Sequence, residues 1–464
     1  MSGDALCFLG GAELGRRIAR GELSPVEVTR AHLERIGRLD AGLGAYLTVT
    51  ADRALAEAAA AEREIAAGRR RGPLHGVPLA LKDLFDTAGV ATTAGSKILA
   101  RHTPARDAAV VERLREAGLV LLGKTNMHEF AFGTTTDNQH YGPCRNPWDR
   151  ERSPGGSSGG SGAALAAGLC AVALGTDSGG SIRIPAAACG VAGLKPTLGR
   201  VSRRGVVPLS WSFDTVGPMA RTVEDLALLL SAIAGPDPAD EWCSARPAAD
   251  FTRDLARGAR GVVIGVPRDW FFDGVEPGIA AAVRAAIAVL EGEGARCAEV
   301  ALPGMADAHT AHHAILASEA AAFHGAWLRE RPQDYGDAIR AALELGALIP
   351  AVDYVNARRV QSAVRATFRA ALAGADVLVT PSLPQAPLRV GEAMSREPEV
   401  AWNRLLTPVN VAGFPALSVP CGFDGAGMPV GLQIIGRPFE EPLLLRVARA
   451  YERATDWSTR RPPE

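Results

Sequence analysis

The sequence predicts an α/β fold, in which helices cover a sheet whose strands are apolar on both faces. Short apolar runs bounded by Gly and Pro alternate with stretches of helical periodicity, as in proteins with buried sheets. Hydrophobic residues fill 47% of the 464 positions, which is ordinary for a globular chain and excludes a disordered one. The strand candidates are Val77–Leu81, Leu119–Leu122, Ala171–Leu174, Val262–Val266, Val377–Thr380, Ala416–Val419 and Val430–Ile435.

The N-terminal part of the chain is expected to be helical. Ser24–Glu27 has the form of a capping box with proline at the first helical position, and apolar residues follow at helical spacing from Val28 to Ile36. A second helix, rich in Ala and Glu, covers about residues 51–67 and ends at Gly68. A further helix is expected over residues 108–117, between the first two strand candidates.

The rest of the chain divides where its composition changes. Residues 235–261, rich in Pro, Asp and Ala, are interpreted as a connection, and residues 270–375 as a largely helical excursion before the strand patterns resume. We therefore predict a single domain over residues 1–464. Its parts are N-terminal helices (1–70), a core (71–235), a helical region (270–375) and a return to the core sheet (376–464).

Charge and cysteine usage exclude several classes of protein. Lys and Arg number 50 against 51 for Asp and Glu, so the chain lacks the basic surface that nucleic acids or anionic membranes attract. The seven cysteines are scattered and never spaced as C-x-x-C, which disfavours a disulfide framework and a thiolate zinc site. No signal peptide is visible, and the longest apolar run, residues 162–175, is shorter than the ~20 residues of a membrane span. We expect a soluble cytoplasmic protein without nucleic-acid or membrane partners.

The segment over residues 153–185 has the composition of a catalytic site. Two Gly/Ser turns flank an Ala-rich helix and a short strand, and glycines surround Ser157, Ser158 and Ser181. Glycines beside a hydroxyl let backbone N–H groups converge on a developing negative charge, as in an oxyanion hole. A pair of flexible Ser/Gly loops accounts for the composition equally well.

Four other features could carry chemistry. Residues 118–125 satisfy the Walker A pattern, but the four intermediate residues are large and apolar, which indicates a strand. His309, His312 and His313 are interpreted as a packed or solvated helix face, because they lack a metal-binding arrangement. His128 has no neighbours that identify it as a catalytic base. Lys82 is the better candidate, since burial at the end of an apolar strand would favour its neutral amine; an exposed lysine past the strand end is the alternative.

The motifs taken together resemble the amidase signature family of serine amidohydrolases. The resemblance extends over nearly the whole chain, and its central Gly/Ser block is highly specific. The residues that carry it are GVPLALKD (76–83), GKTNMHEFAFG (123–133), RNPWD (145–149), SPGGSSGGSGAALAAG (153–168), GTDSGGSIRIPAAACGVAGLKPT (175–197), PVNVAGFPALSVPCGF (408–423) and MPVGLQIIG (428–436).

This resemblance implies a Ser-Ser-Lys triad on a twisted, mostly parallel mixed sheet covered by helices on both faces. Ser181 would be the nucleophile, Ser157 the bridging serine that follows a cis peptide bond, and Lys82 the base. The helical region would set specificity. The chemistry would pass through an acyl-enzyme and require no metal or cofactor.

The resemblance also implies roles for the residues around the triad. The oxyanion hole would consist of the amides of Ser178, Gly179 and Gly180, together with that of the nucleophile. The residues that orient this loop would be Ser158, Asp177 and Arg183. The loop over residues 126–136 would line the substrate pocket through Phe130, Ala131 and Phe132, with the Ala131 carbonyl receiving the substrate N–H.

Two functions follow from the resemblance. The main expectation is a hydrolase that cleaves small or aryl amides without partner proteins, with carbamates (as a urethanase) and ureas as further substrates and a homodimer as the candidate assembly. The segment over residues 96–98 and 140–147 looks closest to bacterial catabolic amidases, including carboxybiuret- and urea-type hydrolases. The alternative is the A-type subunit of a glutamine-dependent tRNA amidotransferase. Against it, no Y-D-G-x-R-Y-G-like segment is present, and residue 184 is Ile where those subunits usually have Gln.

Overall fold

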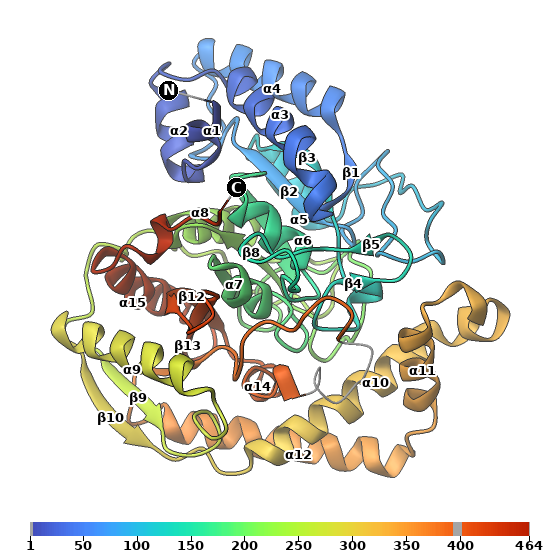
Figure 1. The fold of residues 1–464 in the computed structure, drawn as a ribbon, viewed down its shortest axis with the longest axis vertical. Coiled ribbons are helices and arrows are strands. Elements are labelled where there is room, and N and C mark those ends of the chain that lie inside the picture. The colour runs from blue at the N-terminus through green and yellow to red at the C-terminus, as the bar shows by residue number, and fades with distance from the viewer. Residues whose placement is uncertain (1–2, 393–400, 464) are drawn as a thin grey trace.

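A long mixed sheet runs through the centre of the molecule (Figure 1). The computed structural model describes residues 3–392 and 401–463. The strand order in the sheet is β1-β3-β2-β6-β8-β7-β12-β13-β11-β9-β10. The strands are β1 (Tyr46–Val49), β2 (Pro78–Lys82), β3 (Val120–Thr125), β6 (Val172–Thr176), β7 (Ala192–Lys195), β8 (Val216–Ala220), β9 (Val263–Pro267), β10 (Arg296–Val300), β11 (Val377–Pro381), β12 (Ala416–Phe423) and β13 (Pro429–Ile435). Asp137–Asn138 (β4) and Gly142–Pro143 (β5) form a separate small hairpin.

Helices cover the sheet on both faces, which confirms the expected α/β fold. The α-helices are α1 (Gly3–Cys7), α2 (Gly11–Ala19), α3 (Pro25–Leu43), α4 (Ala51–Ala66), α5 (Ala109–Glu116), α6 (Gly159–Ala166), α7 (Arg183–Cys189), α8 (Val223–Ile233), α9 (Pro277–Gly292), α10 (Met305–Glu330), α11 (Asp337–Ala347), α12 (Ala351–Ala371), α14 (Thr407–Ala412) and α15 (Glu441–Arg453). Short 3-10 turns lie at Glu129–Ala131, Pro332–Asp334 and Trp457–Thr459. Among the described residues, no helix has the length and apolar character needed to cross a bilayer.

The parallel pairings of the sheet lie in two blocks. Strands β3, β2 and β6 pair in parallel, as do β11, β9 and β10, whereas the strands between β6 and β11 pair antiparallel. Every residue of β2, β3 and β6 is buried, which explains why these strands appear in the sequence as continuous apolar runs. The carboxyl ends of β2 and β6 bring Lys82 and Thr176 to the same edge of the sheet.

Local sequence signals placed several elements correctly. The Ser24 hydroxyl oxygen accepts hydrogen bonds from the amides of Val26 and Glu27, so α3 begins at the predicted cap. The Walker A-like segment forms β3, in agreement with its interpretation as a strand. Its Lys124 is buried, with Nζ 2.8 Å from the Thr92 hydroxyl and 3.2 Å from an Asp83 carboxylate oxygen.

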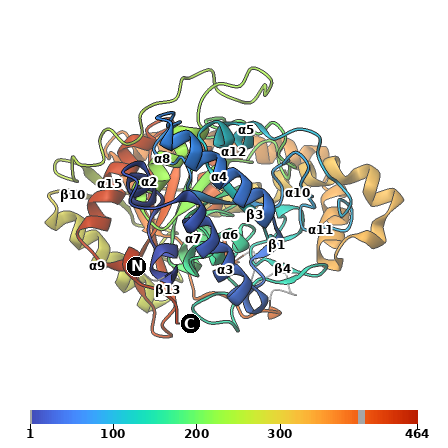
Figure 2. The ribbon, with the colours of Figure 1, turned by 90° about the horizontal axis from the view of Figure 1, so that it is seen from above.

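The helical region begins later than its amino-acid pattern suggests. Within residues 270–375, α9 packs on β12 and β13, and β10 extends the sheet as an edge strand. Strand β10 lacks an apolar run because most of its residues are exposed at the sheet edge. Helices α11 and α12 both pack on α10, and the three helices lie beside the core in both views (Figures 1 and 2). We call these three the insertion helices; α14 packs against α10 and α12.

Candidate active site

Lys82 ends β2 in a fully buried position. Its Nζ lies 2.7 Å from the Ser157 hydroxyl oxygen and 2.9 Å from the Thr176 hydroxyl oxygen. The structure therefore brings Lys82 and Ser157 together across 75 positions of sequence, and the alternative of an exposed lysine is wrong. Thr176, at the end of β6, is a contact that we did not predict, although it lies within the GTDSGG motif.

Burial dominates the electrostatics of Lys82. Loss of hydration lowers the pKa of its amine to about 7, although the carboxylates of Asp214 and Asp177 act to raise it. The Arg183 guanidinium is paired with Asp177 at 2.9 Å, so its positive charge is compensated. A large share of Lys82 is thus uncharged near neutral pH and able to accept a proton.

Ser157 and Ser181 lie on two loops that contact each other. The Gly156–Ser157 peptide bond is cis, as the resemblance implied. The Ser158 amide donates to the Ser181 carbonyl at 3.2 Å, and the Ser157 carbonyl accepts from the His128 amide at 3.2 Å. Ser181 is 6% exposed, and its hydroxyl forms no hydrogen bond within the described part of the chain. This hydroxyl is free to meet a substrate.

The backbone around Ser181 offers fewer free amides than expected. The Gly180 N–H donates to a carboxylate oxygen of Asp177 at 2.8 Å, which withdraws it from the predicted oxyanion hole. In residues 3–392 and 401–463, no acceptor is found for the amides of Ser178, Gly179 and Ser181. Amides without a protein acceptor are available to an oxyanion.

A buried ion pair holds this loop in place. The Asp177 carboxylate accepts two bonds from the Arg183 guanidinium, each 2.9 Å long, and a third from the Asn410 side-chain amide at 2.8 Å. Burial raises the pKa of Asp177, but the Arg183 charge outweighs it and holds that pKa below the ordinary value. Arg183 also donates to Gln433 at 2.7 Å. Ser158, the third predicted orienting residue, has its hydroxyl 3.3 Å from the Thr176 carbonyl.

Asp214 is a second anchor, which sequence reasoning missed. Its carboxylate accepts from the Ser178 hydroxyl at 2.5 Å and from the amides of Leu209 and Ser210 at 2.9 and 3.0 Å. Burial raises the pKa of Asp214. A single Asp in the loop SWSFDT carries no motif, so the residue could be found only from the folded chain.

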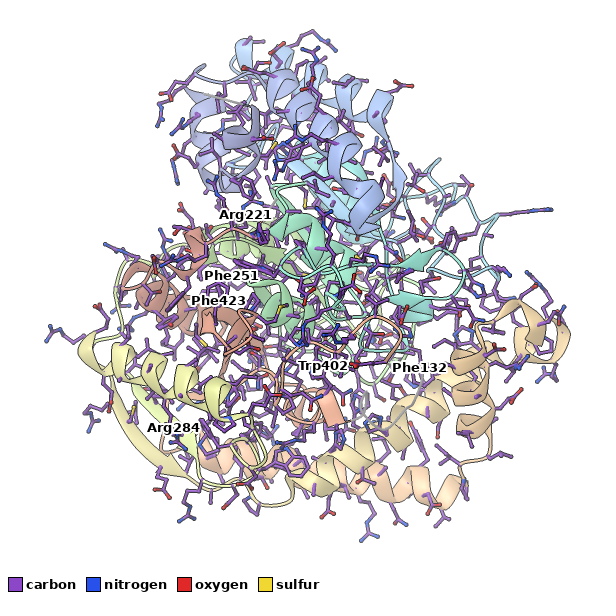
Figure 3. The ribbon with its side chains drawn as sticks, in the orientation of Figure 1. Phe132, Arg221, Phe251, Arg284, Trp402 and Phe423 are labelled. Atoms are coloured by element: carbon purple, nitrogen blue, oxygen red, sulfur yellow. The ribbon has the colours of Figure 1, made fainter. Side chains whose placement is uncertain are left out.

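The predicted pocket loop is bound to the insertion helices. Its 3-10 turn contains positive φ angles at Phe130 (49°) and Ala131 (60°). The Phe130 ring is 2% exposed and packs edge-on against His324 of α10 with ring centroids 4.3 Å apart, so it supports the loop from behind. The Ala131 carbonyl accepts no hydrogen bond from the described residues. Phe132 is half-buried on the side of the core that faces the insertion helices (Figure 3).

Glu129 ties the same loop to the insertion. Its buried carboxylate accepts from the Ser96 hydroxyl at 2.5 Å and from the Gly336 amide, just before α11, at 2.9 Å. His140 Nε2 lies 3.1 Å from the same carboxylate. The position of the pocket loop therefore depends on the insertion helices.

A cavity of about 470 Å³ lies next to the site. Thr176 and Asp214, which contact Lys82 and Ser178 respectively, form part of its wall. The outer wall consists of loop residues that include Arg203, Trp211 and Trp242. A small molecule in this cavity would be separated from Lys82 by the side chain of Thr176.

The histidines of α10 pack inward. His309 Nδ1 lies 2.8 Å from the Thr407 hydroxyl, and His312 Nε2 lies 2.8 Å from the Ser178 carbonyl oxygen. Among the described residues, no group of three or more His, Cys, Asp or Glu side chains is arranged to hold a metal ion. These histidines are a packed helix face, one of the two outcomes expected from the sequence.

Comparisons with known proteins give this site a context. The family model named Amidase matches residues 27–445. The A-type subunit of a glutamyl-tRNA(Gln) amidotransferase from Chloroflexus aggregans is 45% identical over 96% of this chain and 96% of that protein. A solved structure described as a vestigial protein complex, which reveals the evolutionary origins of an s-triazine catabolic enzyme, has a TM-score of 0.92 and 41% identity over 96% of this chain and 98% of that one. The A-type subunit of the glutamyl-tRNA(Gln) amidotransferase from Thermotoga maritima has a TM-score of 0.83 and 34% identity over 97% and 95% of the two chains.

These relatives overturn two sequence-based expectations. A hydrolase of small amides, aryl amides or carbamates that needs no partner does not agree with near full-length similarity to one component of an amidotransferase. A homodimer with only a small-molecule substrate, and with nucleic acid excluded, is wrong for the same reason. The charge argument failed because the net charge of one chain describes only the surface of that chain.

Proposed function

We propose, from the premise that this chain belongs to the amidase family, that it is the A-type subunit of a glutamine-dependent tRNA amidotransferase. In that role it would release ammonia from the side-chain amide of glutamine. The observation that carries the proposal is 45% identity to the A-type subunit of a glutamyl-tRNA(Gln) amidotransferase over 96% of both chains. The solved structure with a TM-score of 0.92 is also described as a protein complex, which supports dependence on partners.

The first chemical step is the attack of Ser181 on the amide carbonyl carbon. The Ser181 proton passes to Ser157 as the Ser157 proton passes to the Lys82 amine, and a C–O bond forms. The 2.7 Å separation of Lys82 Nζ and Ser157 Oγ supports the second of these transfers. The oxyanion is stabilised by the amides of Gly179 and Ser181, which have no acceptor among the described residues.

The second step expels the amine. The Lys82 ammonium returns a proton through Ser157 to the amide nitrogen, the C–N bond breaks, and ammonia leaves a glutamyl ester on Ser181. Without that proton the nitrogen would be a poor leaving group. Water then attacks the ester, with Lys82 and Ser157 taking its proton, and glutamate is released.

The cavity beside Lys82 supports a separate exit for ammonia. Its wall includes Thr176, whose hydroxyl is 2.9 Å from Lys82 Nζ, and loop residues such as Arg203 and Trp242. A volume of about 470 Å³ is ample for a molecule of this size. The glutamine carboxylate would be held by residues other than those usual in such subunits, since residue 184 is Ile and the usual Arg-containing segment is absent from the sequence.

The test is a glutaminase assay with and without partners. Purified chain is incubated with glutamine alone, and then with the remaining subunits of such an amidotransferase, glutamyl-tRNA and ATP. Ammonia is measured by a coupled dehydrogenase assay. We expect release that depends on the partners and is absent with Ser181→Ala. An assembly that forms but never releases ammonia from glutamine would contradict the proposal.

A further inference from the structure

Helix α10 contacts the catalytic loops through polar residues on one face. His309, His312 and Glu319 are spaced by three and seven positions, which places them on the same side of a helix. His309 contacts Thr407 at the start of α14, and Glu319 accepts from the Ser210 and Ser212 hydroxyls. His312 lies between them and reaches the loop that carries Ser181. The proposed mechanism gives it no role.

His312 is bound to one specific backbone atom. Its Nε2 lies 2.8 Å from the Ser178 carbonyl oxygen, and because a carbonyl can only accept, Nε2 carries the proton. Nδ1 is then a bare acceptor in the neutral ring; it is buried without a partner in the described part of the chain. Burial lowers the pKa of His312 to about 4, so the ring keeps this single-proton form at neutral pH.

The bond to the Ser178 carbonyl also determines where the next amide points. The Ser178–Gly179 peptide is planar and trans, so its C=O and N–H are directed oppositely. A donor that holds the carbonyl toward α10 therefore holds the Gly179 N–H away from α10. That N–H is one of those without an acceptor among the described residues.

The surroundings restrict the movement of both partners. The Phe213 ring stacks on His312 at a centroid distance of 4.9 Å and an angle of 21°. Asp214, the next residue, accepts from the Ser178 hydroxyl at 2.5 Å, so Ser178 is held at its side chain and at its carbonyl. A Cβ at position 179 would lie 2.7 Å from His312 Cε1, so glycine is required for this close approach.

We propose that His312 is a positioning residue, which orients the Ser178–Gly179 peptide so that the Gly179 N–H faces the oxyanion formed on attack by Ser181. The insertion helices thereby complete the oxyanion hole of the core. The inference rests on the serine chemistry of the proposed function and is independent of which amide is cleaved.

The experiment measures the reaction of Ser181 with diisopropyl fluorophosphate, whose P=O oxygen needs the same amide donors. The full chain is used, and the second-order rate of labelling is followed by intact-mass spectrometry with peptide mapping. His312→Phe keeps a stacking ring but removes the donor, and His312→Gln keeps an N–H of similar reach. His32→Phe is the matched control, because His32 is equally buried and its Nδ1 lies 2.8 Å from the Val28 carbonyl oxygen of its own helix.

We expect His312→Phe to label about 10- to 100-fold more slowly than wild type, since a misdirected oxyanion donor costs up to about 10²–10³-fold. His312→Gln should recover most of the rate, and His32→Phe should match wild type. The pH midpoint of labelling should be the same in His312→Gln and wild type, because a neutral donor does not titrate there. If His312→Phe does not fold, His312→Met replaces it as the variant that lacks a hydrogen-bond donor.

Two results would overturn the inference. One is a wild-type rate in the donor-free variant; the other is an equal loss in the Phe and Gln variants, which would make the ring a space-filling group. If Ser181 labels normally but glutamine is not hydrolysed, the proposed function is contradicted. The labelling rates of the His312 variants then still decide the inference. A wild-type chain that never labels at Ser181, either alone or with the partner subunits added, would defeat both.

Discussion

The Lys82 amine nitrogen lies 2.7 Å from the Ser157 hydroxyl oxygen, in a place where neither side chain is exposed to solvent. A hydrogen bond of this length lets a proton pass between the two atoms without a water molecule. In the proposed mechanism, Lys82 is the base that accepts the proton of Ser157. Several expected results follow from it and from the contacts around it.

The rate of Ser181 acylation should rise with pH and level off above about pH 8. The base acts only when Lys82 has lost its proton, and burial lowers its pKa to about 7. The rate should therefore be half-maximal near pH 7 and fall about tenfold for each pH unit below it. The check is the rate of fluorophosphate labelling from about pH 5.5 to about pH 9. Neutral His309 and His312, whose pKa values are lowered by burial to about 4, cannot supply this midpoint. A rate that still rises about tenfold per pH unit near pH 9, as it would for a lysine with the ordinary pKa of ~10.4, would contradict it.

Lys82→Ala should slow amides more than matched esters. The substrates to compare are glutamine and the γ-methyl ester of glutamate, in the assembled complex. An alkoxide leaves with less help from a proton donor than an amine does, so loss of Lys82 should lower the amide rate by a further ~10-fold or more. Lys82→Arg should not restore activity, because a guanidinium cannot accept a proton at usable pH. Equal losses for both substrates, with the pH profile unchanged, would mean that Lys82 only supports the serine loops.

Ser181 and Ser157 should differ in what their removal costs. Ser181→Ala removes the atom that forms the acyl-enzyme, so labelling and turnover should vanish. Ser157→Ala should leave a small residual rate, because a water molecule can occupy the space between Ser181 and Lys82 imperfectly. Peptide mapping of the labelled wild-type chain should place the phosphoryl group on Ser181. A label on Ser157 or Ser158 with Ser181 unmodified would reverse the assignment.

Arg183→Met should destabilise the fold strongly. The substitution leaves the Asp177 carboxylate buried without its guanidinium partner, and breaking such a pair typically costs about 3–5 kcal/mol. Arg460→Met is the control, since Arg460 pairs with Asp456 at the surface, where the cost is about 0–1 kcal/mol. Urea unfolding of both variants measures the difference. Similar losses in the two variants would show that Arg183 does not stabilise the site through its charge.

The sequence by itself determined most elements of the fold and supplied the residues that we propose to react. Continuous apolar runs marked β2, β3 and β6, because strands buried on both faces need apolar side chains at every position. Ser24 marked the start of α3 because a cap bonds to amides two and three residues away. The Gly/Ser motifs pointed to Ser157 and Ser181, and the end of an apolar strand pointed to Lys82, which contacts Ser157. The proposal that partners are needed rests on the similarity of the whole chain to a subunit of an amidotransferase, because composition describes only the surface of one chain.

Only the tertiary structure decided which residues hold the site in its working shape. His312 meets Ser178 across 134 positions and Asp214 meets it across 36, and neither belongs to a motif. Gly180 was expected to stabilise the oxyanion, but its amide is occupied by Asp177, a bond that depends on how the loop closes. The physical reason is the range of the interactions. Hydrophobic periodicity and helix caps act within a few residues of the chain, whereas a buried hydrogen bond between a helix and a distant loop exists only after both have packed against the same core.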